Sequence, residues 1–274
     1  MKAIFITNPL PGRDFNSELR FPLIAASFFK KAYPESECVL ASSGEIPKCF
    51  SEVFTTIKFP FNEGPHALMR SIFWREYVGS SLFQDTTFFI GHDVIVLDRF
   101  PSFSQFAVMT NYRYHPSQPY CSDFIVVNPS KKNAVQQIFD EALTAHRWMP
   151  RNIQDGAADQ LSWANTLGMP ETELFDGNPI VPPRKGNVVA LPVDPFFFTP
   201  NDAFPVKASE FTGRTRRDYV FTEELMREYM VSKKSLHFKG PRKGDMIKFA
   251  EWAWKNGDIK INILNYSDEE FFKS

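Results

Sequence analysis

The hydrophobic pattern at the start of the chain predicts a strand, a helix and a second strand. Residues 3–7 (AIFIT) form a short apolar run, residues 21–34 carry apolar side chains at helical spacing, and residues 37–42 (ECVLAS) form another apolar run. Short continuous apolar runs are typical of buried strands, whereas a spacing of three and four residues is typical of a helix. The order β-α-β indicates a parallel sheet with helices packed on its faces.

The same patterns continue along most of the chain. Helices are predicted over residues 65–83, 131–147, 156–168, 221–234 and 247–256. Strands are predicted over residues 86–90, 94–97, 105–111, 123–128 and 259–264. Residues 179–205 are different, because they contain seven prolines and almost no periodicity. A segment of that length is too long for a passive connection in a compact domain, so we expect a functional loop or a mobile lid.

Composition narrows the class of protein. The 274 residues are 43% hydrophobic and 15% aromatic, which suits one large folded domain and is unlike a disordered chain. The cysteines form no CxxC pair and cannot build a disulfide framework; they are Cys38, Cys49 and Cys121. The apolar run before Asn8 is too short for a signal peptide or a membrane span. We therefore expect a soluble, cytoplasmic protein.

The formal net charge of −1 conceals a basic region near the C-terminus. Residues 207–249 hold eleven Lys and Arg against six Asp and Glu, a local charge of +5, so the remainder carries −6. Such a region usually faces an anion, which could be a small-ligand phosphate, a nucleic acid or an anionic membrane surface. The alternative is a solvated helix face with ion pairs between residues three and four positions apart.

The central apolar stretch TTFFIGHDVIVLDRF, residues 86–100, is interrupted by Gly91, His92 and Asp93. Ligands of open α/β sheets bind beyond the carboxyl ends of the strands, and Asp93 lies at such an end. A carboxylate there is costly to bury unless it meets a cation or strong hydrogen-bond donors. Asp93 is therefore either a ligand-binding acid or the cap of the turn that follows.

Other polar groups adjoin predicted elements in the same way. Ser122 and Asp123 precede an apolar strand, and Asp159 and Gln160 open a helix. The segment LHFKGPRKGDM offers an imidazole, glycines and two cations, at His237, Gly240, Arg242, Lys243 and Gly244. Oxygen and imidazole ligands, flexible backbone and a lysine together suit a diphosphate bridged by a divalent metal.

These motifs, in their order along the chain, resemble a known enzyme family. The segments SIFWREY, TTFFIGHDVIV, YCSDFIVVN, ADQLSWAN and LHFKGPRK are similar to those of the glycogenin-like, lipopolysaccharide-type glycosyltransferases of family eight. The resemblance extends over residues 1–245. It implies an α/β fold of GT-A type, with a central mixed, mostly parallel sheet, helices on both faces and a Rossmann-like N-terminal half. It also implies a nucleoside-diphosphate sugar as donor, a UDP-sugar first of all, and a divalent metal, Mn²⁺ or Mg²⁺.

The resemblance implies a division of the chain and a role for each matched residue. Residues 1–178 would be the nucleotide-sugar-binding core, 179–206 the Pro-rich loop or lid, and 207–274 a basic segment completing the donor site and the acceptor side. Asp93 and His237 would bind the metal. The residues expected to contact the donor are Thr7, Asn8, Arg75, His92, Ser122, Gly240, Arg242 and Lys243. The residues expected to take part in catalysis are Asp159, Gln160 and Asp123.

Three departures from the family pattern leave alternatives open. Gly91 replaces the first acid of the Asp-x-Asp motif, Asp123 stands where the family has glycine, and Gly244-Asp245 replaces a Pro-Trp pair. Metal binding would then depend on Asp93 and His237, with His92 as a substitute ligand, or the enzyme would be metal-independent. The family retains anomeric configuration, whereas an inverting enzyme would need Asp123 or Asp159 as a base. A catalytically inactive sugar-nucleotide-binding or scaffold protein is the alternative outside enzymes.

Two acceptors are compatible with the sequence. A saccharide is the acceptor that the resemblance implies. A hydroxymethylated base in bacteriophage DNA is the other, since the segment GRTRRDY at 213–219 could bind phosphates and aromatic side chains could stack on an extruded base. The further residues that would serve DNA are Lys233, Lys234, Lys239, Tyr112, Tyr114 and Phe196 to Phe198. No pattern in the sequence indicates an oligomeric state.

Overall fold

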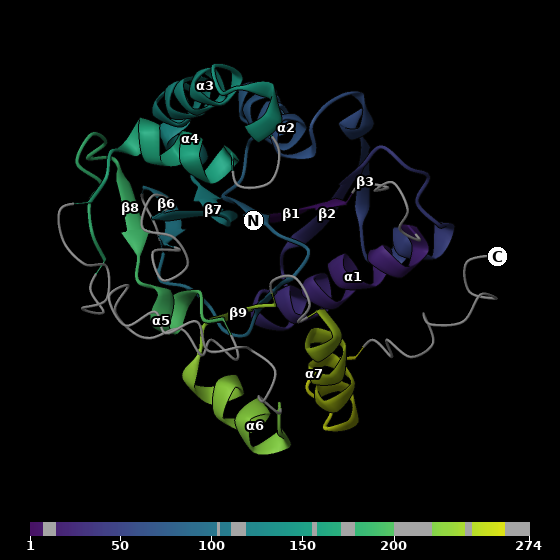
Figure 1. Ribbon diagram of the computed structural model, residues 1–274. Helices are drawn as coiled ribbons and strands as arrows, with labels where there is room; N and C mark the ends of the chain where they lie inside the picture. The colour runs from purple at the N-terminus through teal and green to yellow at the C-terminus, as the bar shows by residue number, and fades with distance from the viewer. Residues whose placement is uncertain are drawn as a thin grey trace.

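A seven-stranded sheet forms the centre of the molecule in the computed structural model (Figure 1). The structure describes residues 1–7, 15–102, 105–110, 119–154, 158–170, 179–199, 221–238 and 243–260. The strand order is β3-β2-β1-β4-β7-β6-β8. The bounds are β1 Lys2–Thr7, β2 Glu37–Ser42, β3 Thr55–Lys58, β4 Thr87–Ile90, β6 Phe106–Thr110, β7 Tyr120–Val127 and β8 Val188–Leu191.

The sheet is mixed and mostly parallel, which confirms the predicted fold class. Strand β1 pairs in parallel with β2 and with β4, β2 with β3, and β6 with β8. Strand β7 is antiparallel to both β4 and β6. Because β7 runs against β4, the start of β7 lies beside the end of β4, with Phe124 opposite Ile90. This pairing brings two segments distant in sequence to one edge of the sheet.

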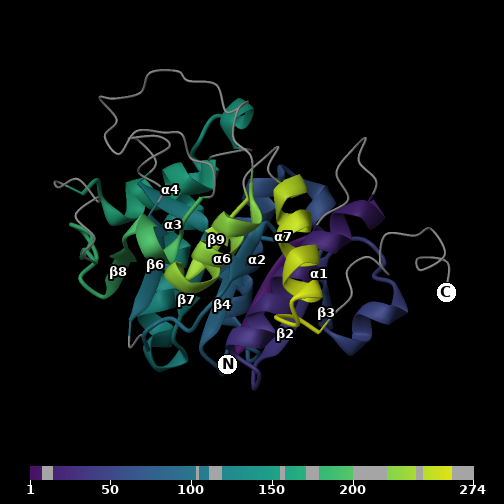
Figure 2. The same cartoon turned by 90° about the horizontal axis from the view of Figure 1, so that it is seen from below.

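Helices cover both faces of the sheet (Figures 1 and 2). One face carries α2, α3 and α4, and the other carries α1, α6 and α7. The bounds are α1 Phe15–Ala32, α2 His66–Gly79, α3 Lys132–Arg147, α4 Ala158–Leu167, α5 Val193–Phe196, α6 Glu223–Ser232 and α7 Lys243–Lys255. Short 3-10 turns occur at Lys48–Glu52, Phe61–Glu63, Pro129–Lys131 and Arg151–Ile153. Among the described helices, none is long and apolar enough to cross a membrane.

Alternating side chains of the central strands belong to two separate hydrophobic cores. Ile4 and Phe89 face the core beneath α2, α3 and α4, whereas Phe5 and Phe88 face the core beneath α1 and α7. Successive side chains of a strand point to opposite faces, so strands buried on both sides read as continuous apolar runs. The C-terminal α7 lies against α1, and the rings of Phe28 and Phe249 stack with centroids 5.5 Å apart.

The interrupted stretch of residues 86–100 divides between two sheets. Strand β4 belongs to the central sheet, whereas β5 (Val94–Val96) pairs antiparallel with β9 (Ser235–His237) in a separate two-stranded sheet. Val94 lies opposite His237 in this pairing, and the Phe238 N–H donates to the Asp93 carbonyl at 2.8 Å. The second sheet therefore holds His237 beside Asp93.

Part of the segment predicted as a loop or lid is regular structure instead. Residues 188–191 form β8, the edge strand beside β6, and Ile180 bridges to Ala190. Beyond α5, Phe197 is fully buried against His237, with ring centroids 4.8 Å apart. Within residues 179–199, β8 is the edge strand of the central sheet. Phe197 packs against His237 of the two-stranded sheet. Residues 200–205 lie outside the described residues.

Other elements also differ from the sequence prediction, and β7 and α7 start three and four residues earlier than predicted. Helix α1 begins at Phe15, six residues before the predicted start, and includes Pro22. Burial of Leu19 stabilises the added part, and burial of Phe21 and Leu23 stabilises the helix around Pro22, which lacks a backbone donor. Strand β3 was not predicted, because an edge strand with mostly exposed side chains has no apolar run. The predicted strand 259–264 falls mainly outside the described residues.

Candidate active site

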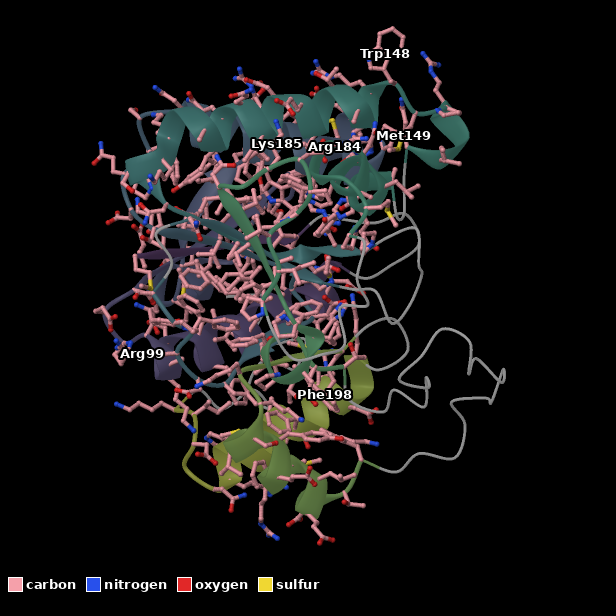
Figure 3. All side chains as sticks on the ribbon, turned by 90° about the vertical axis from the view of Figure 1, so that its left-hand side faces the viewer. Arg99, Trp148, Met149, Arg184, Lys185 and Phe198 are labelled. Carbon is pink, nitrogen blue, oxygen red and sulfur yellow. The ribbon has the colours of Figure 1, made fainter. Side chains whose placement is uncertain are left out.

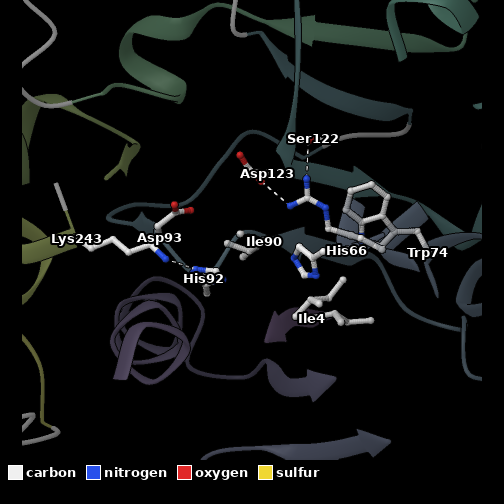
Figure 4. A pocket seen from close by; sticks show the side chains of 12 residues that line it. Ile4, His66, Trp74, Ile90, His92, Asp93, Ser122, Asp123 and Lys243 are labelled. Carbon is white, nitrogen blue, oxygen red and sulfur yellow. Dashed lines mark hydrogen bonds and ion pairs between the residues drawn. The ribbon is translucent and has the colours of Figure 1, made fainter. Parts of the chain in front are cut away.

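A polar pocket of about 270 Å³ lies at the carboxyl ends of β1 and β4 (Figure 4). Open α/β sheets bind ligands at this edge. Its apolar side chains come mainly from β1 and the end of β4, and its charged side chains come from α2, the turn after β4, β7 and α7. Its lining residues are Ile4, Ile6, His66, Arg70, Trp74, Ile90, Gly91, His92, Asp93, Ser122, Asp123 and Lys243.

One corner of this site brings two carboxylates to a buried histidine. The Nε2 atom of His237 lies 3.6 Å from Oδ1 of Asp93 and 3.7 Å from Oδ2 of Asp123. The His237 side chain is only 1% exposed, and neither ring nitrogen has a hydrogen-bond partner among the described residues. A buried imidazole without partners costs free energy, so this arrangement favours a bound cation or another ligand.

The donor types at this corner fit a hard divalent metal. Carboxylate oxygens are ligands that both Mn²⁺ and Mg²⁺ accept, and an imidazole nitrogen favours the transition metal Mn²⁺ over Mg²⁺. As the side chains stand, no three or more His, Cys, Asp or Glu groups in the described part of the chain are already arranged to hold an ion. A metal between the two carboxylates would nevertheless give the buried Nε2 of His237 the partner that it lacks.

Gly91 is required by the close approach of β7. Its N–H donates to the Asp123 carbonyl at 2.7 Å. A Cβ atom built on Gly91 would lie 2.9 Å from Cβ of Asp123 and 3.2 Å from Oδ1 of Asp93. The distance to Cβ of Asp123 is shorter than real Cβ contacts. The side chain of Asp123 thus occupies the space that any side chain at position 91 would enter.

Arg70 is a central charged residue of the site that the sequence analysis missed. Its guanidinium donates to Oδ1 of Asp123 at 2.8 Å and to Oγ of Ser122 at 3.1 Å, and it forms an ion pair with Asp159. Asp159 is fully buried. Burial lowers the pKa of Arg70, but the charges of Asp159 and Asp123 raise it by more, so the net pKa is above its usual value. Arg70 therefore remains a cation that fixes both carboxylates.

A second cation, Lys243, stands at the start of α7. Its Nζ lies 2.6 Å from Nε2 of His92, 3.2 Å from Oε2 of Glu18 and 4.9 Å from the centroid of the Phe21 ring. Burial is the main cause that lowers the pKa of His92; the charge of Asp93 opposes this effect and that of Lys243 adds to it. An ammonium group only donates hydrogen bonds, so Nε2 of His92 accepts and the imidazole is neutral.

The structure brings most of the predicted site residues together. His92, Asp93, Ser122, Asp123 and Lys243 line the pocket. His237 and Asp159 lie directly behind it, in contact with Asp93, Asp123 and Arg70 as described above.

Apart from Arg75, the remaining predicted residues divide into two groups. Thr7, at the end of β1 opposite Ser42, and Gln160, next to Asp159, are both buried but do not line the pocket. Asn8, Gly240 and Arg242 lie outside the described residues, so their expected contacts with the donor stay predictions.

Arg75 was predicted to contact the donor, and the structure places it elsewhere. Its Nε donates to Oδ1 of Asp140 at 2.5 Å, and both side chains are about half exposed. Arg70 and Arg75 are five positions apart, which corresponds to about 140° around a helix axis. Arg70 instead shares the buried face of α2 with Trp74, and its guanidinium lies 5.1 Å from that ring. An arginine on the apolar face of a predicted helix was the signal that could have identified it.

Comparison with known proteins rests on structure alone. No protein-family model matches the sequence, and no curated protein matches it either. An active-site mutant of LgtC superposes with a TM-score of 0.56 at 16% identity, over 99% of each chain. The galactosyltransferase LgtC in complex with donor and acceptor sugar analogs gives 0.54 at 14%, also over 99% of each chain. The glycosyltransferase GlyE of Streptococcus pneumoniae TIGR4 gives 0.53 at 12%, over 99% of this chain and 63% of that one. The protein therefore has the α/β fold of these GT-A glycosyltransferases.

Proposed function

We propose that this protein transfers a sugar from a nucleoside-diphosphate sugar to an acceptor hydroxyl. The observation that carries the proposal is the meeting of opposite charges at the carboxyl edge of the sheet. Asp93, Asp123 and His237 meet at one corner of the site, and the ammonium group of Lys243 lies beside Asp93 in the same pocket (Figure 4). A cation bound by the acidic corner, together with a lysine, suits a diphosphate, whose negative charge grows as the sugar departs. The shared fold supports this assignment.

The cation in this proposal is a divalent metal, Mn²⁺ or Mg²⁺, held by Asp93 and His237. When bound, it would supply Lewis-acid stabilisation of the leaving diphosphate. The backbone of Asp93 is held in place by a hydrogen bond, since its carbonyl accepts the Phe238 N–H. His237 is fixed by β9 and by the ring of Phe197. Both groups are thus preorganised by the pairing of β5 with β9.

Lys243 is the residue proposed to hold the diphosphate directly. The side chains around it keep the ammonium at the pocket: Glu18 accepts from it, neutral His92 accepts from it, and Phe21 lies beneath it. Arg70 has a different role, because its guanidinium is already bonded to two carboxylates and Ser122. It positions Asp123 at the part of the pocket where the sugar would lie and anchors to Asp159, which is buried behind it.

Retention of anomeric configuration is the outcome that the contacts favour. An inverting enzyme needs a general base within hydrogen-bonding reach of the acceptor hydroxyl. Asp159 is fully buried and paired with Arg70, and Oδ1 of Asp123 is bonded to the same guanidinium. With both carboxylates engaged, the acceptor proton would pass to the departing diphosphate oxygen while the new bond forms on the same face of the sugar.

A saccharide acceptor is favoured over a DNA base by the ion pairs of the described lysines. Lys233 pairs with Asp194 at 2.8 Å, and Lys234 pairs with Asp98. Phe198, which the DNA alternative would use for stacking, lies beside α6 (Figure 3), with Lys233 Nζ 4.3 Å from its ring centroid and Tyr229 at 5.1 Å. The segment 213–219 lies outside the described residues. Transfer to hydroxymethylated DNA that falls steeply with added salt would instead support the DNA acceptor.

Nucleotide binding and donor hydrolysis test the function. Nucleoside diphosphates should raise the melting temperature, because a ligand that binds only the native state stabilises it. UDP is expected to give the largest shift, and UDP-sugars with Mn²⁺ should release free sugar and UDP. If no nucleoside diphosphate shifts the melting temperature, the proposed function is wrong. Binding without turnover, with and without Mn²⁺, would identify an inactive sugar-nucleotide-binding protein.

Substitution of Lys243 by alanine is expected to weaken UDP binding by about tenfold to a hundredfold, the value of a hydrogen bond to a charged group. Lys248→Ala is the matched control, since Lys248 lies on the same helix with its side chain 67% exposed. Isothermal titration calorimetry of both variants gives the two dissociation constants. Equal affinity of Lys243→Ala and the unaltered protein would remove Lys243 from the donor site.

A further inference from the structure

Positions 91 and 123 share one side-chain space at the carboxyl end of β4. A Cβ atom on Gly91 would lie 2.9 Å from Cβ of Asp123 and 3.4 Å from its carboxyl carbon. Only one of the two positions can therefore carry a side chain without a shift of the strands. In this chain the carboxylate is carried by β7, and the glycine directly follows β4.

The carboxylate of Asp123 faces the same histidine as Asp93. Its Oδ2 lies 3.7 Å from Nε2 of His237, and Oδ1 of Asp93 lies 3.6 Å from that atom. Both distances are too long for hydrogen bonds. Ligands of Mg²⁺ lie about 2.0–2.1 Å from the ion, so two of them at right angles are roughly 2.8–3.0 Å apart. The observed distances are longer than this, so the two carboxylates would move inward toward His237 to complete the set.

We propose that Asp123 is the third protein ligand of the cation, supplied from β7 in place of an acid that the chain lacks at position 91. The ligand set is then Asp93, Asp123 and His237. This inference rests on the proposed function for the presence of a cation, and it adds the residue that completes its site.

Arg70 shapes the role of Asp123 in this site. It holds Oδ1 of Asp123 at 2.8 Å, while Oδ2 faces His237 and accepts the Cys121 thiol at 3.7 Å. The two oxygens of one carboxylate thus serve different partners, the guanidinium on one side and the cation on the other. Such a bond to a ligating carboxylate orients it, and the loss of such outer contacts lowers metal affinity by about 10–100-fold.

An ion pair without metal is the competing explanation of this cluster. A protonated His237 would satisfy two carboxylates by charge alone. The two explanations differ in what Mn²⁺ does to the protein in the absence of any sugar nucleotide. Under the proposal Mn²⁺ binds and Asp123 contributes to its affinity; under the ion-pair explanation Mn²⁺ has no site.

Titration of the full chain with MnCl₂ alone, followed by the electron paramagnetic resonance signal of free Mn²⁺, measures this binding directly. The unaltered protein should bind one Mn²⁺. Asp123→Asn keeps the shape of the side chain and should weaken Mn²⁺ binding by about tenfold or more. Asp140→Asn is the control, because Asp140 is a half-exposed carboxylate paired with Arg75 away from this pocket, and its affinity should equal that of the unaltered protein.

Moving the carboxylate between the two positions provides the sharper test. Asp123→Gly should lose Mn²⁺ binding, and the double variant Gly91→Asp/Asp123→Gly should regain affinity by about tenfold over Asp123→Gly, because the acid then enters the vacated space from the residue after β4. Circular dichroism spectra and melting temperatures confirm that each variant is folded. The near-isosteric Asp123→Asn covers the case in which a glycine variant does not fold.

Two results would overturn the inference. One is an Asp123→Asn variant that is folded and binds Mn²⁺ as tightly as the unaltered protein; the other is an unaltered protein that binds no Mn²⁺ at millimolar concentration. Because no sugar nucleotide is present, these outcomes are separate from the test of transfer. Intact UDP-dependent stabilisation with unchanged Mn²⁺ affinity in Asp123→Asn would leave the proposed function standing and remove Asp123 from the cation site.

Discussion

Replacing Arg70 with methionine is expected to lower the free energy of unfolding by about 3–5 kcal/mol, because it leaves buried carboxylates without their cation. Asp159 is fully buried and Asp123 is only 15% exposed at its side chain. Removing one partner of a buried charge network is more damaging than removing the whole network. For a chain of this size the melting temperature should fall by several degrees, roughly 2–4 °C per kcal/mol.

Arg75→Met on the same helix is the control for this experiment. Arg75 also pairs with an aspartate, but both side chains are about half exposed. Exposed pairs contribute about 0–1 kcal/mol, so urea unfolding should distinguish the two variants clearly. Adding Asp159→Asn to Arg70→Met should recover part of the lost stability, since it removes a buried charge. Equal stabilities of Arg70→Met and Arg75→Met would contradict the buried network.

Changing Asp93 to asparagine is expected to lower the rate of donor turnover by about 10²–10³-fold, with little change in the melting temperature. The substitution keeps the size of the side chain and removes the charge that faces His237 at 3.6 Å. Loss of transition-state stabilisation of several kcal/mol corresponds to a rate effect of this size. Release of UDP from a UDP-sugar with Mn²⁺ present measures it.

Asp98→Asn is the matched control for Asp93→Asn. Asp98 follows β5, is 58% exposed at its side chain and pairs with Lys234 rather than facing the pocket. Its turnover should equal that of the unaltered protein. If Asp93→Asn retains full Mn²⁺-stimulated turnover, then Asp93 has no part in the reaction, and the acidic corner would need another explanation.

The sheet could be predicted where its strands are buried on both faces. Strands β1, β2, β4 and β7 appear as apolar runs because each contributes to two cores. The exceptions lie at the edges: β3 has mostly exposed side chains, and β8 lies within a Pro-rich stretch without periodicity. Edge strands are held by tertiary contacts that a local pattern does not contain.

Residues of the candidate site could be predicted where they interrupt an apolar run. Asp93 stands out because it ends a buried strand, and Lys243 and His237 stand out in a polar segment. Arg70 could not be separated from Arg75 by resemblance alone, because which face of α2 meets the pocket depends on how the helix packs. The contact between Gly91 and Asp123 depends on the antiparallel pairing of β4 with β7, which no local signal shows.

The pairing of β5 with β9 has a consequence for how the protein becomes competent during its synthesis. Strands β1 to β8 are complete once the ribosome has added residue 191, and N-terminal parts of a chain generally fold first. His237 and Lys243 are added only later, and β5 has no partner strand until Ser235–His237 emerges. A nascent chain that already holds the central sheet therefore has half of the proposed donor site, and truncation before residue 235 removes the other half without removing any strand of that sheet.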